Sequence, residues 1–205
     1  MIITIASSKG GVGKTTTAMH LACYFQMRGP TLLVDADLNR SALDWWEMGN
    51  TPIKVVTEEQ AADVMSQFEH CVVDRPAEQV SDYTKELARS SDLLVIPAAP
   101  DSLSLLALLK IADDLKGLPK GSYRVLLTIC PPKPSRAASE AREAIKAMDI
   151  PLFKGQIRRY AAFQKAAVQG VPVYEALHSS EGSKAADNRE EAWKDYLAVG
   201  REILP

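Results

Sequence analysis

The chain has 205 residues and a mass of 22.4 kDa, which suits one domain whose core needs neither disulfides nor a structural metal. A formal net charge of −2 excludes general basicity, so any DNA contact needs a local patch. The three cysteines, Cys23, Cys71 and Cys130, lie far apart and are odd in number, which favours a reducing compartment such as the cytoplasm over a disulfide framework. No stretch approaches the about 18 apolar residues of a membrane span.

Apolar segments alternate with helix-like segments along the chain. The sequence predicts strands over 2–7, 31–35, 53–56, 70–74, 92–97 and 123–130, and helices over 14–28, 40–48, 58–68, 80–90, 101–116, 135–147, 160–169 and 186–203. The strand segments are almost continuously apolar, which is typical of strands covered on both faces. The order predicts a single α/β domain with a doubly wound, mainly parallel sheet and helices on both faces. The polar segment 179–188 is predicted to connect the last helix to the body.

The octapeptide 9–16, Lys-Gly-Gly-Val-Gly-Lys-Thr-Thr, lies between the first predicted strand and the first predicted helix. Its three glycines lack Cβ atoms and can take positive φ, so backbone N–H groups can converge on phosphate oxygens. The helix N-terminus adds partial positive charge. Lys14 is predicted to reach the β- and γ-phosphates of a nucleotide, and the Thr15 hydroxyl to ligate Mg²⁺. The segment predicts a P-loop, in which Ser8 replaces the first glycine of the usual G-x-x-x-x-G-K-[ST] pattern.

Lys-Gly-Gly-x-Gly-Lys-Thr resembles the deviant Walker A box of the ParA/MinD family of P-loop ATPases. The resemblance implies that Lys9 crosses a dimer interface to the partner's nucleotide phosphates, so that Lys9 and Lys14 both act in catalysis and hydrolysis depends on an ATP-bound homodimer. It implies a nucleotide site that includes Lys9, Gly10, Gly11, Val12, Gly13, Lys14, Thr15 and Thr16. The alternative for Lys9 taken alone is a solvated loop lysine.

Acidic residues follow the second and fourth predicted strands. Asp-Ala-Asp-Leu-Asn-Arg, which begins at Asp35, resembles the family's Walker A′ motif, with Leu38 in place of its usual proline, and Asp74 resembles a Walker B aspartate. The resemblance implies that Asp35 and Asp74 hold the metal shell and that Asp37 positions the attacking water. Mg²⁺ keeps several waters, which suits such second-shell carboxylates. The alternative for Asp35 and Asp37 is capping of the helix that follows.

The base-binding region is predicted by resemblance to lie in the loops 128–133 and 155–160, with Arg159 near the nucleotide. The N-K-x-D signature of GTPases is absent, which favours ATP as the cofactor together with Mg²⁺. The sequence leaves Arg75, which follows the Walker B-like aspartate, without a role.

The segment from Ile150 to Tyr174 contains no acidic residue. It contains four cations that we take as candidate DNA contacts: Lys154, Arg158, Arg159 and Lys165. In ParA-like proteins basic residues of the C-terminal half bind DNA through its phosphates without reading sequence, and only in the ATP-bound dimer. The alternative is a solvated basic face.

The terminal segment places Trp193, Leu197, Gly200 and Leu204 along one helical face, and its charges sum to −1. Because anionic lipid surfaces favour helices rich in Lys and Arg, this face is predicted to dock on the protein's own core and not on a membrane.

Within the family the chain looks like small ParA proteins typified by ParF and like the carboxysome-positioning McdA group. The resemblance implies a cytoplasmic, nucleoid-associated ATPase that binds DNA when ATP-loaded and positions a plasmid or a microcompartment. An adaptor of the ParB, ParG or McdB kind stimulates hydrolysis. The alternatives are a membrane-associated positioning ATPase like MinD and an ATP-using enzyme like dethiobiotin synthetase.

Overall fold

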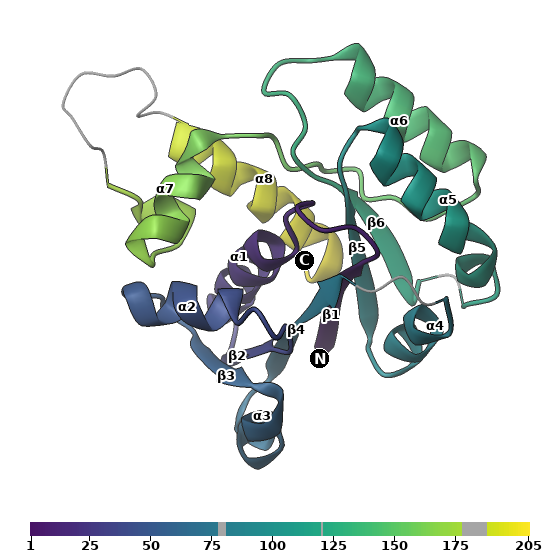
Figure 1. The fold of residues 1–205 in the computed structure, drawn as a ribbon. Coiled ribbons are helices and arrows are strands. Elements are labelled where there is room, and N and C mark those ends of the chain that lie inside the picture. The colour runs from purple at the N-terminus through teal and green to yellow at the C-terminus, as the bar shows by residue number, and fades with distance from the viewer. Residues whose placement is uncertain (78–80, 120, 178–187) are drawn as a thin grey trace.

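A six-stranded parallel sheet forms the centre of the computed structural model, which describes residues 1–77, 81–119, 121–177 and 188–205 (Figure 1). Its strand order is β3-β2-β4-β1-β5-β6. The strands are β1 (Ile2–Ser7), β2 (Thr31–Asp35), β3 (Lys54–Thr57), β4 (His70–Ala77), β5 (Leu93–Ala98) and β6 (Tyr123–Leu127). The helices are α1 (Lys14–Gln26), α2 (Ser41–Met48), α3 (Glu58–Val64), α4 (Ser81–Arg89), α5 (Ser102–Lys116), α6 (Arg136–Ala147), α7 (Ala161–Gln169) and α8 (Asn188–Ile203). The predicted doubly wound α/β fold is confirmed.

Several element boundaries differ from the prediction for identifiable reasons. The last strand ends at Leu127 instead of residue 130, because Ile129 takes a left-handed conformation with φ of 54° that no strand accommodates. The third helix ends as an α-helix at Val64 and continues as a 3₁₀ turn, Met65–Gln67. The predicted connector 179–188 lies outside the described residues except for Asn188, which begins α8.

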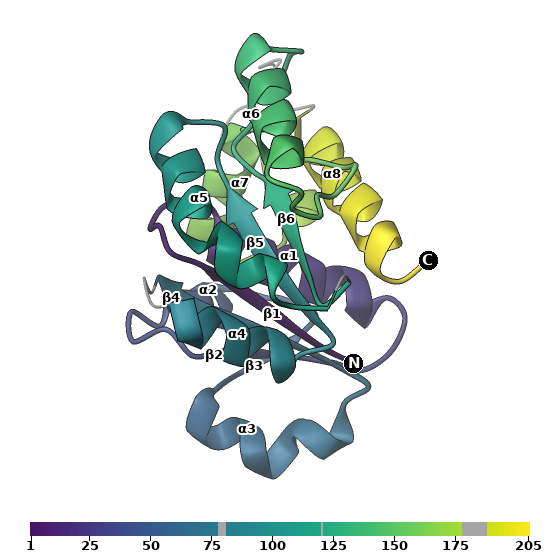
Figure 2. The same cartoon turned by 90° about the vertical axis from the view of Figure 1, so that its right-hand side faces the viewer.

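Helices cover both faces of the sheet, as Figures 1 and 2 show. On one face α1, α2, α7 and α8 pack over inward-facing sheet residues such as Leu33 and Val72. On the other face α4, α5 and α6 cover β5 and β6, whereas α3 covers Leu32 and Val34. Neighbouring residues of one strand thus enter opposite clusters, as the two-residue repeat of a strand requires.

Polar caps fix where several helices begin. The Asp101 side chain accepts a hydrogen bond from Ser104 N at the start of α5, and Ser135 does the same for Ala138 N at α6. The first helix instead begins after Gly13, which has φ of 83° and brings no side-chain cap. The start of α1 therefore leaves its N–H groups without a side-chain acceptor from its cap residue, which suits an anion.

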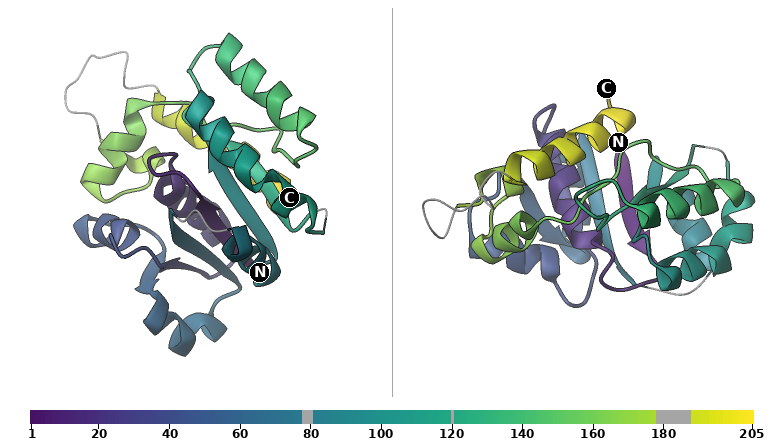
Figure 3. Two further views of the ribbon diagram at one scale, coloured as in Figure 1. Left: turned by 45° about the vertical axis from the view of Figure 1, so that its right-hand side comes forward. Right: turned by 90° about the horizontal axis from the view of Figure 1, so that it is seen from above.

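The terminal helix α8 docks on the protein's own core, as predicted. Trp193, Leu197 and Leu204 are partly buried against the cluster around α1, and the view from above in Figure 3 shows α8 lying along this body. A Cβ atom at Gly200 would stand 2.5 Å from the ring of Tyr24, so glycine permits the close approach of α8 and α1. Among the described residues, no helix combines the length and hydropathy that crossing a bilayer demands.

Candidate functional site

The carboxyl ends of β1, β2 and β4 bring the predicted motifs to one edge of the sheet. Ile5 of β1 and Asp35 of β2 are both in register with Asp74 of β4. The glycine-rich loop follows β1 directly. The parallel sheet thus assembles segments that are far apart in sequence, at the edge where open α/β folds bind ligands.

A cavity of about 940 Å³ opens at this edge. It is lined by Gly10, Gly11, Gly13, Lys14, Thr15, Thr16, Asp37, Asn39, Ser41, Pro76, Ala77, Thr128, Ile129, Pro132, Ile157, Arg158, Arg159, Tyr160, Ala161, Phe163, Gln164 and Tyr196. Both loops predicted to form the base-binding region contribute to the wall, and so does Arg159. The volume falls in the range of cofactor sites, so the cavity has room for a nucleotide.

The glycine-rich loop has the conformation of a phosphate cradle. Gly11 and Gly13 have φ of 74° and 83°, and an added Cβ at either would be strained. Val12 is 2% exposed, and its carbonyl accepts a 2.7 Å hydrogen bond from the Thr128 hydroxyl, which ties the loop to the end of β6. Lys14, only 8% exposed, lines the cavity.

Lys9 lies outside the cavity that its neighbours line. Its ammonium donates hydrogen bonds to Asp101 Oδ1 at 2.9 Å and to Ser104 Oγ at 3.0 Å, both at the start of α5. The subunit therefore does not direct Lys9 at its own nucleotide site. Its predicted role toward a partner stays a prediction.

Asp35 caps helix α2. Its Oδ2 accepts hydrogen bonds from Ala42 N and Leu43 N, each at 2.9 Å, and its Oδ1 accepts one from Asp37 N at 3.1 Å. The side chain is buried and does not line the cavity. In the structure Asp35 thus caps α2, which is the alternative that the sequence left open. Its role in holding a metal stays a prediction.

Asp37 occupies the cavity wall in the loop between β2 and α2. Its Oδ1 accepts hydrogen bonds from Asn39 N and Asn39 Nδ2, each at 2.9 Å, whereas Oδ2 accepts none from the described residues. Leu38 is 97% exposed. The loop thus presents one carboxylate oxygen of Asp37 without a hydrogen bond from the described residues. It ends at Arg40, whose backbone is left-handed, with φ of 52°.

Asp74 is a buried carboxylate that lacks hydrogen-bond partners. It is 1% exposed, and neither oxygen has a partner among the described residues. Burial raises the pKa of Asp74 to about 7, and the charges of Asp35 and Asp37 also act to raise it. The Thr15 hydroxyl and the charge of Lys14 act to lower this pKa. An unpartnered buried carboxylate beside a threonine hydroxyl is a donor set that fits Mg²⁺, which prefers oxygen ligands.

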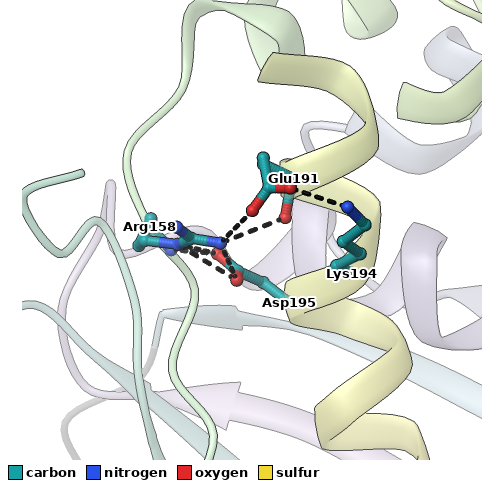
Figure 4. A network of polar contacts seen from close by, with 4 residues as sticks. All are labelled: Arg158, Glu191, Lys194 and Asp195. Carbon is teal, nitrogen blue, oxygen red and sulfur yellow. Dashed lines mark hydrogen bonds and ion pairs between the residues drawn. The ribbon is translucent and has the colours of Figure 1, made fainter. Parts of the chain in front are cut away.

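Arg158 joins the cavity wall to α8 (Figure 4). Its guanidinium contacts Asp195 at 2.7 to 3.1 Å and Glu191 at 3.2 Å, and Lys194 in turn pairs with Glu191. Hydrogen bonding to Asp195 raises the pKa of Arg158 still further above its ordinary range. Two carboxylates thus compensate its charge within the subunit and tie its loop to α8. The predicted DNA contact of Arg158 stays a prediction.

The other predicted DNA contacts lie in separate settings. The backbone of Lys154 donates to Glu202 near the end of α8, while its side chain is exposed. Arg159 lines the cavity, and Lys165 lies on α7. The segment that has no acidic residues of its own therefore runs along the acidic residues of α8. Arg75, which had no assigned role, forms a 2.8 Å ion pair with Glu58.

Residues 3–173 match the model of the CobQ/CobB/MinD/ParA nucleotide binding domain. The chain belongs to this family. The match covers the cradle, both acidic segments and the loops around the cavity, so the chain is a P-loop ATPase of the ParA/MinD type.

Relatives of this ATPase match nearly its whole length. The maintenance of carboxysome distribution protein A of Gloeobacter kilaueensis is 31% identical over 210 residues, covering 98% of this chain and 93% of that protein. The cell division protein MinD of Aquifex aeolicus superposes with a TM-score of 0.71 at 16% identity, covering 99% and 96%. An McdA–ATP complex from Cyanothece gives a TM-score of 0.66 at 17% identity, covering 98% and 95%. The two structures establish the fold.

Aromatic residues behind the cavity of this ATPase were missed by the sequence analysis. Phe163 and Tyr196 line the cavity and pack around His20 of α1, with ring centroids 5.3 and 4.9 Å from the imidazole. His20 is fully buried, donates from Nδ1 to Thr16 O and accepts at Nε2 from Val173 N. No sequence motif marks these residues, because only the packing of α7 and α8 on α1 brings them together.

Burial lowers the pKa of His20 to about 4, so we expect stability to fall in mild acid. The unfolded state binds a proton near pH 6.5 and the folded state near pH 4; stability is therefore full above pH 6.5 and falls as the pH drops toward 4. Between pH 7 and pH 5 this group alone costs about 2 kcal/mol. Urea denaturation of the wild type and of His20→Gln at both pH values measures it. Equal pH dependence of the two proteins would contradict the assignment.

Proposed function

We propose that the chain is an ATP-dependent dimerising switch that binds nucleoid DNA non-specifically and positions an intracellular cargo. The observation that carries the proposal is the cradle at the cavity: positive-φ glycines, a buried Lys14 and the unpartnered Asp74 meet at one edge of the sheet. A phosphate chain with its metal satisfies all three at once.

The cavity residues account for the reaction as follows. The loop N–H groups and Lys14 would bind and orient the phosphates, and Thr15 of the cavity wall, together with the buried Asp74 beside it, would hold the metal shell. Bound Mg²⁺ supplies charge neutralisation at the phosphates. Asp37, through its free oxygen, orients a water and takes its proton. Charge stabilisation and alignment are the main requirements of phosphoryl transfer, so these groups suffice for slow basal turnover.

The proposed dimer explains Lys9. A lysine that lies outside its own cavity and beside the cavity's edge is available to a second copy, and in a two-fold dimer each copy gives its lysine to the other. Hydrolysis then depends on dimerisation, because the extra cation arrives only with the partner.

The cargo is proposed from the relative that spans nearly the whole chain. That relative is a maintenance of carboxysome distribution protein, which makes a carboxysome or a related microcompartment the favoured cargo over a plasmid. An adaptor that links cargo to the ATP-bound dimer and stimulates hydrolysis completes the switch. The cytoplasm, with the nucleoid as a track, is the proposed location.

DNA contact is assigned to Lys154, whose side chain is exposed, and to Lys165, whose side chain is partly exposed; neither forms an ion pair among the described residues. We expect Lys154→Ala combined with Lys165→Ala to weaken ATP-dependent DNA binding about tenfold and to reduce the salt slope by about two counterions. Fluorescence anisotropy with a random-sequence duplex at several salt concentrations measures both quantities. Lys116→Ala is the matched control, since Lys116 is an exposed lysine already paired with Asp113 at 3.3 Å.

The same assay separates the alternatives when anionic vesicles replace DNA. Binding to DNA with ATP and not with ADP supports the proposal. Binding to vesicles instead identifies a membrane-associated regulator, and binding to neither identifies an enzyme that uses the cavity for a small substrate. Unchanged DNA affinity and salt slope in the double variant would remove Lys154 and Lys165 from the interface.

A further inference from the structure

The ammonium of Lys9 completes a closed polar triangle at the start of α5. Besides the bonds from Lys9 to Asp101 Oδ1 and Ser104 Oγ, the Ser104 hydroxyl donates to Asp101 Oδ2 at 2.7 Å. Ser104 is 3% exposed, so it is a fixed part of the helix terminus. Lys9 thus has two acceptors that are held in place independently of it.

Lys9 and Lys14 differ in whether a carboxylate of their own subunit compensates their charge. The charge of Lys9 is matched by a carboxylate in its own subunit, whereas Lys14 lines the cavity and forms no ion pair among the described residues. Burial tends to raise the pKa of Asp101, but the hydrogen bonds from Lys9 and Ser104 outweigh it and lower the pKa to about 2. Asp101 is therefore ionised at any pH at which the protein works.

We propose that Asp101, assisted by Ser104, is a positioning residue that holds Lys9 in its own subunit and restrains dimerisation until a nucleotide-loaded second copy takes the lysine. The inference rests on the proposed function, in which Lys9 acts on the partner's phosphates. Asp101 and Ser104 occupy two of the three N–H donors of Lys9, so the phosphates of a second copy compete with them for this ammonium. The carboxylate left behind then repels the incoming phosphates.

The restraint is expected to be modest for each subunit and larger for the dimer. The two side chains are 32% and 46% exposed, and ion pairs at such exposure shift equilibria about threefold. A two-fold dimer requires the exchange twice, so the effects multiply to about tenfold. A restraint of this size delays assembly at low nucleotide occupancy without preventing it.

Asp101→Asn separates the restraint from the helix cap. Asparagine caps helices as well as aspartate does, so α5 keeps its start while the charge on Lys9 loses its counter-ion. Sedimentation velocity with Mg²⁺ and a nonhydrolysable ATP analogue is expected to give a dimer dissociation constant about tenfold lower than for the wild type. The nucleotide affinity of the monomer is expected to stay unchanged, because Lys9 does not line its own cavity. Asp113→Asn, which frees Lys116 at the other end of α5, is the control with the same charge change.

Lys9→Ala keeps failure of this inference distinct from failure of the proposed function. Loss of dimerisation in Lys9→Ala with a tightened dimer in Asp101→Asn supports both. Loss in Lys9→Ala with an unchanged or weaker dimer in Asp101→Asn overturns the restraint and leaves the function standing. Wild-type dimerisation in Lys9→Ala overturns the role of Lys9 itself. An equal tightening in Asp113→Asn would assign the effect to net charge and overturn the restraint.

Discussion

Replacement of Asp37 by alanine is expected to lower the rate of ATP hydrolysis at least about 100-fold while ATP binding persists. Asp37 lines the cavity through a carboxylate of which only one oxygen is occupied, by the two bonds from Asn39. Phosphate binding depends on the glycine loop and Lys14 instead, so loss of the carboxylate removes water positioning and leaves the cradle intact. ATP-bound dimer should then accumulate, because it is no longer consumed.

Asp37→Asn is the informative companion variant. Its amide oxygen can still accept both bonds from Asn39, so the loop keeps its shape while the charge that takes a proton is lost. We expect single-turnover hydrolysis to be slow in both variants, and light scattering with ATP to find dimer in both. If Asp37→Ala fails to bind ATP, Asp37 belongs to nucleotide binding; if Asp37→Asn hydrolyses ATP normally, the loop's shape matters and its charge does not.

The fold was accessible from the sequence because its strands carry a strong local signal. Segment 31–35 has an apolar centre and is buried along its whole length, which is typical of a strand covered on both faces, and its predicted boundaries were confirmed, as were those of 2–7. The error at β6 occurred where a single backbone conformation ends the strand, whereas β4 continues beyond its predicted end at Asp74, to Ala77. Ile129, a β-branched residue at positive φ, gives no local warning that β6 has already ended.

The residues of the candidate site also differ in whether a local sequence signal marks them. Residues that chemistry fixes within one loop, such as Lys14 and Thr15, were located by motif. Partners supplied by distant segments were not located: the carboxylates that compensate Arg158 come from α8, and the one that holds Lys9 comes from the start of α5. A charge read from sequence gives its sign, whereas its availability depends on what the fold places opposite it.

Asp35 and Asp74 allow a test of how the surroundings of a buried carboxylate set its effect on stability. The two aspartates are in register on neighbouring strands, but they differ in their hydrogen-bond partners. Asp35 accepts three backbone N–H groups, and Asp74 accepts no hydrogen bond among the described residues. For the nucleotide-free protein at pH 8 we expect Asp74→Asn to raise the unfolding free energy by about 2 kcal/mol, since it removes a buried unpartnered charge. Asp35→Asn should lower it by about 2 kcal/mol, since an amide nitrogen then faces a backbone donor.

Addition of Mg²⁺ and ATP is expected to reverse the ranking of wild type and Asp74→Asn. A ligand at 100 times its dissociation constant stabilises the folded protein by about 2.7 kcal/mol, and Asp74→Asn should lose most of the magnesium-dependent part. Urea denaturation with ATP, in Mg²⁺ and then in EDTA, measures that part for each variant. Equal magnesium-dependent stabilisation of wild type and Asp74→Asn would exclude Asp74 from the metal shell. The burial of a carboxylate without a partner at Asp74 would then need an explanation other than metal binding.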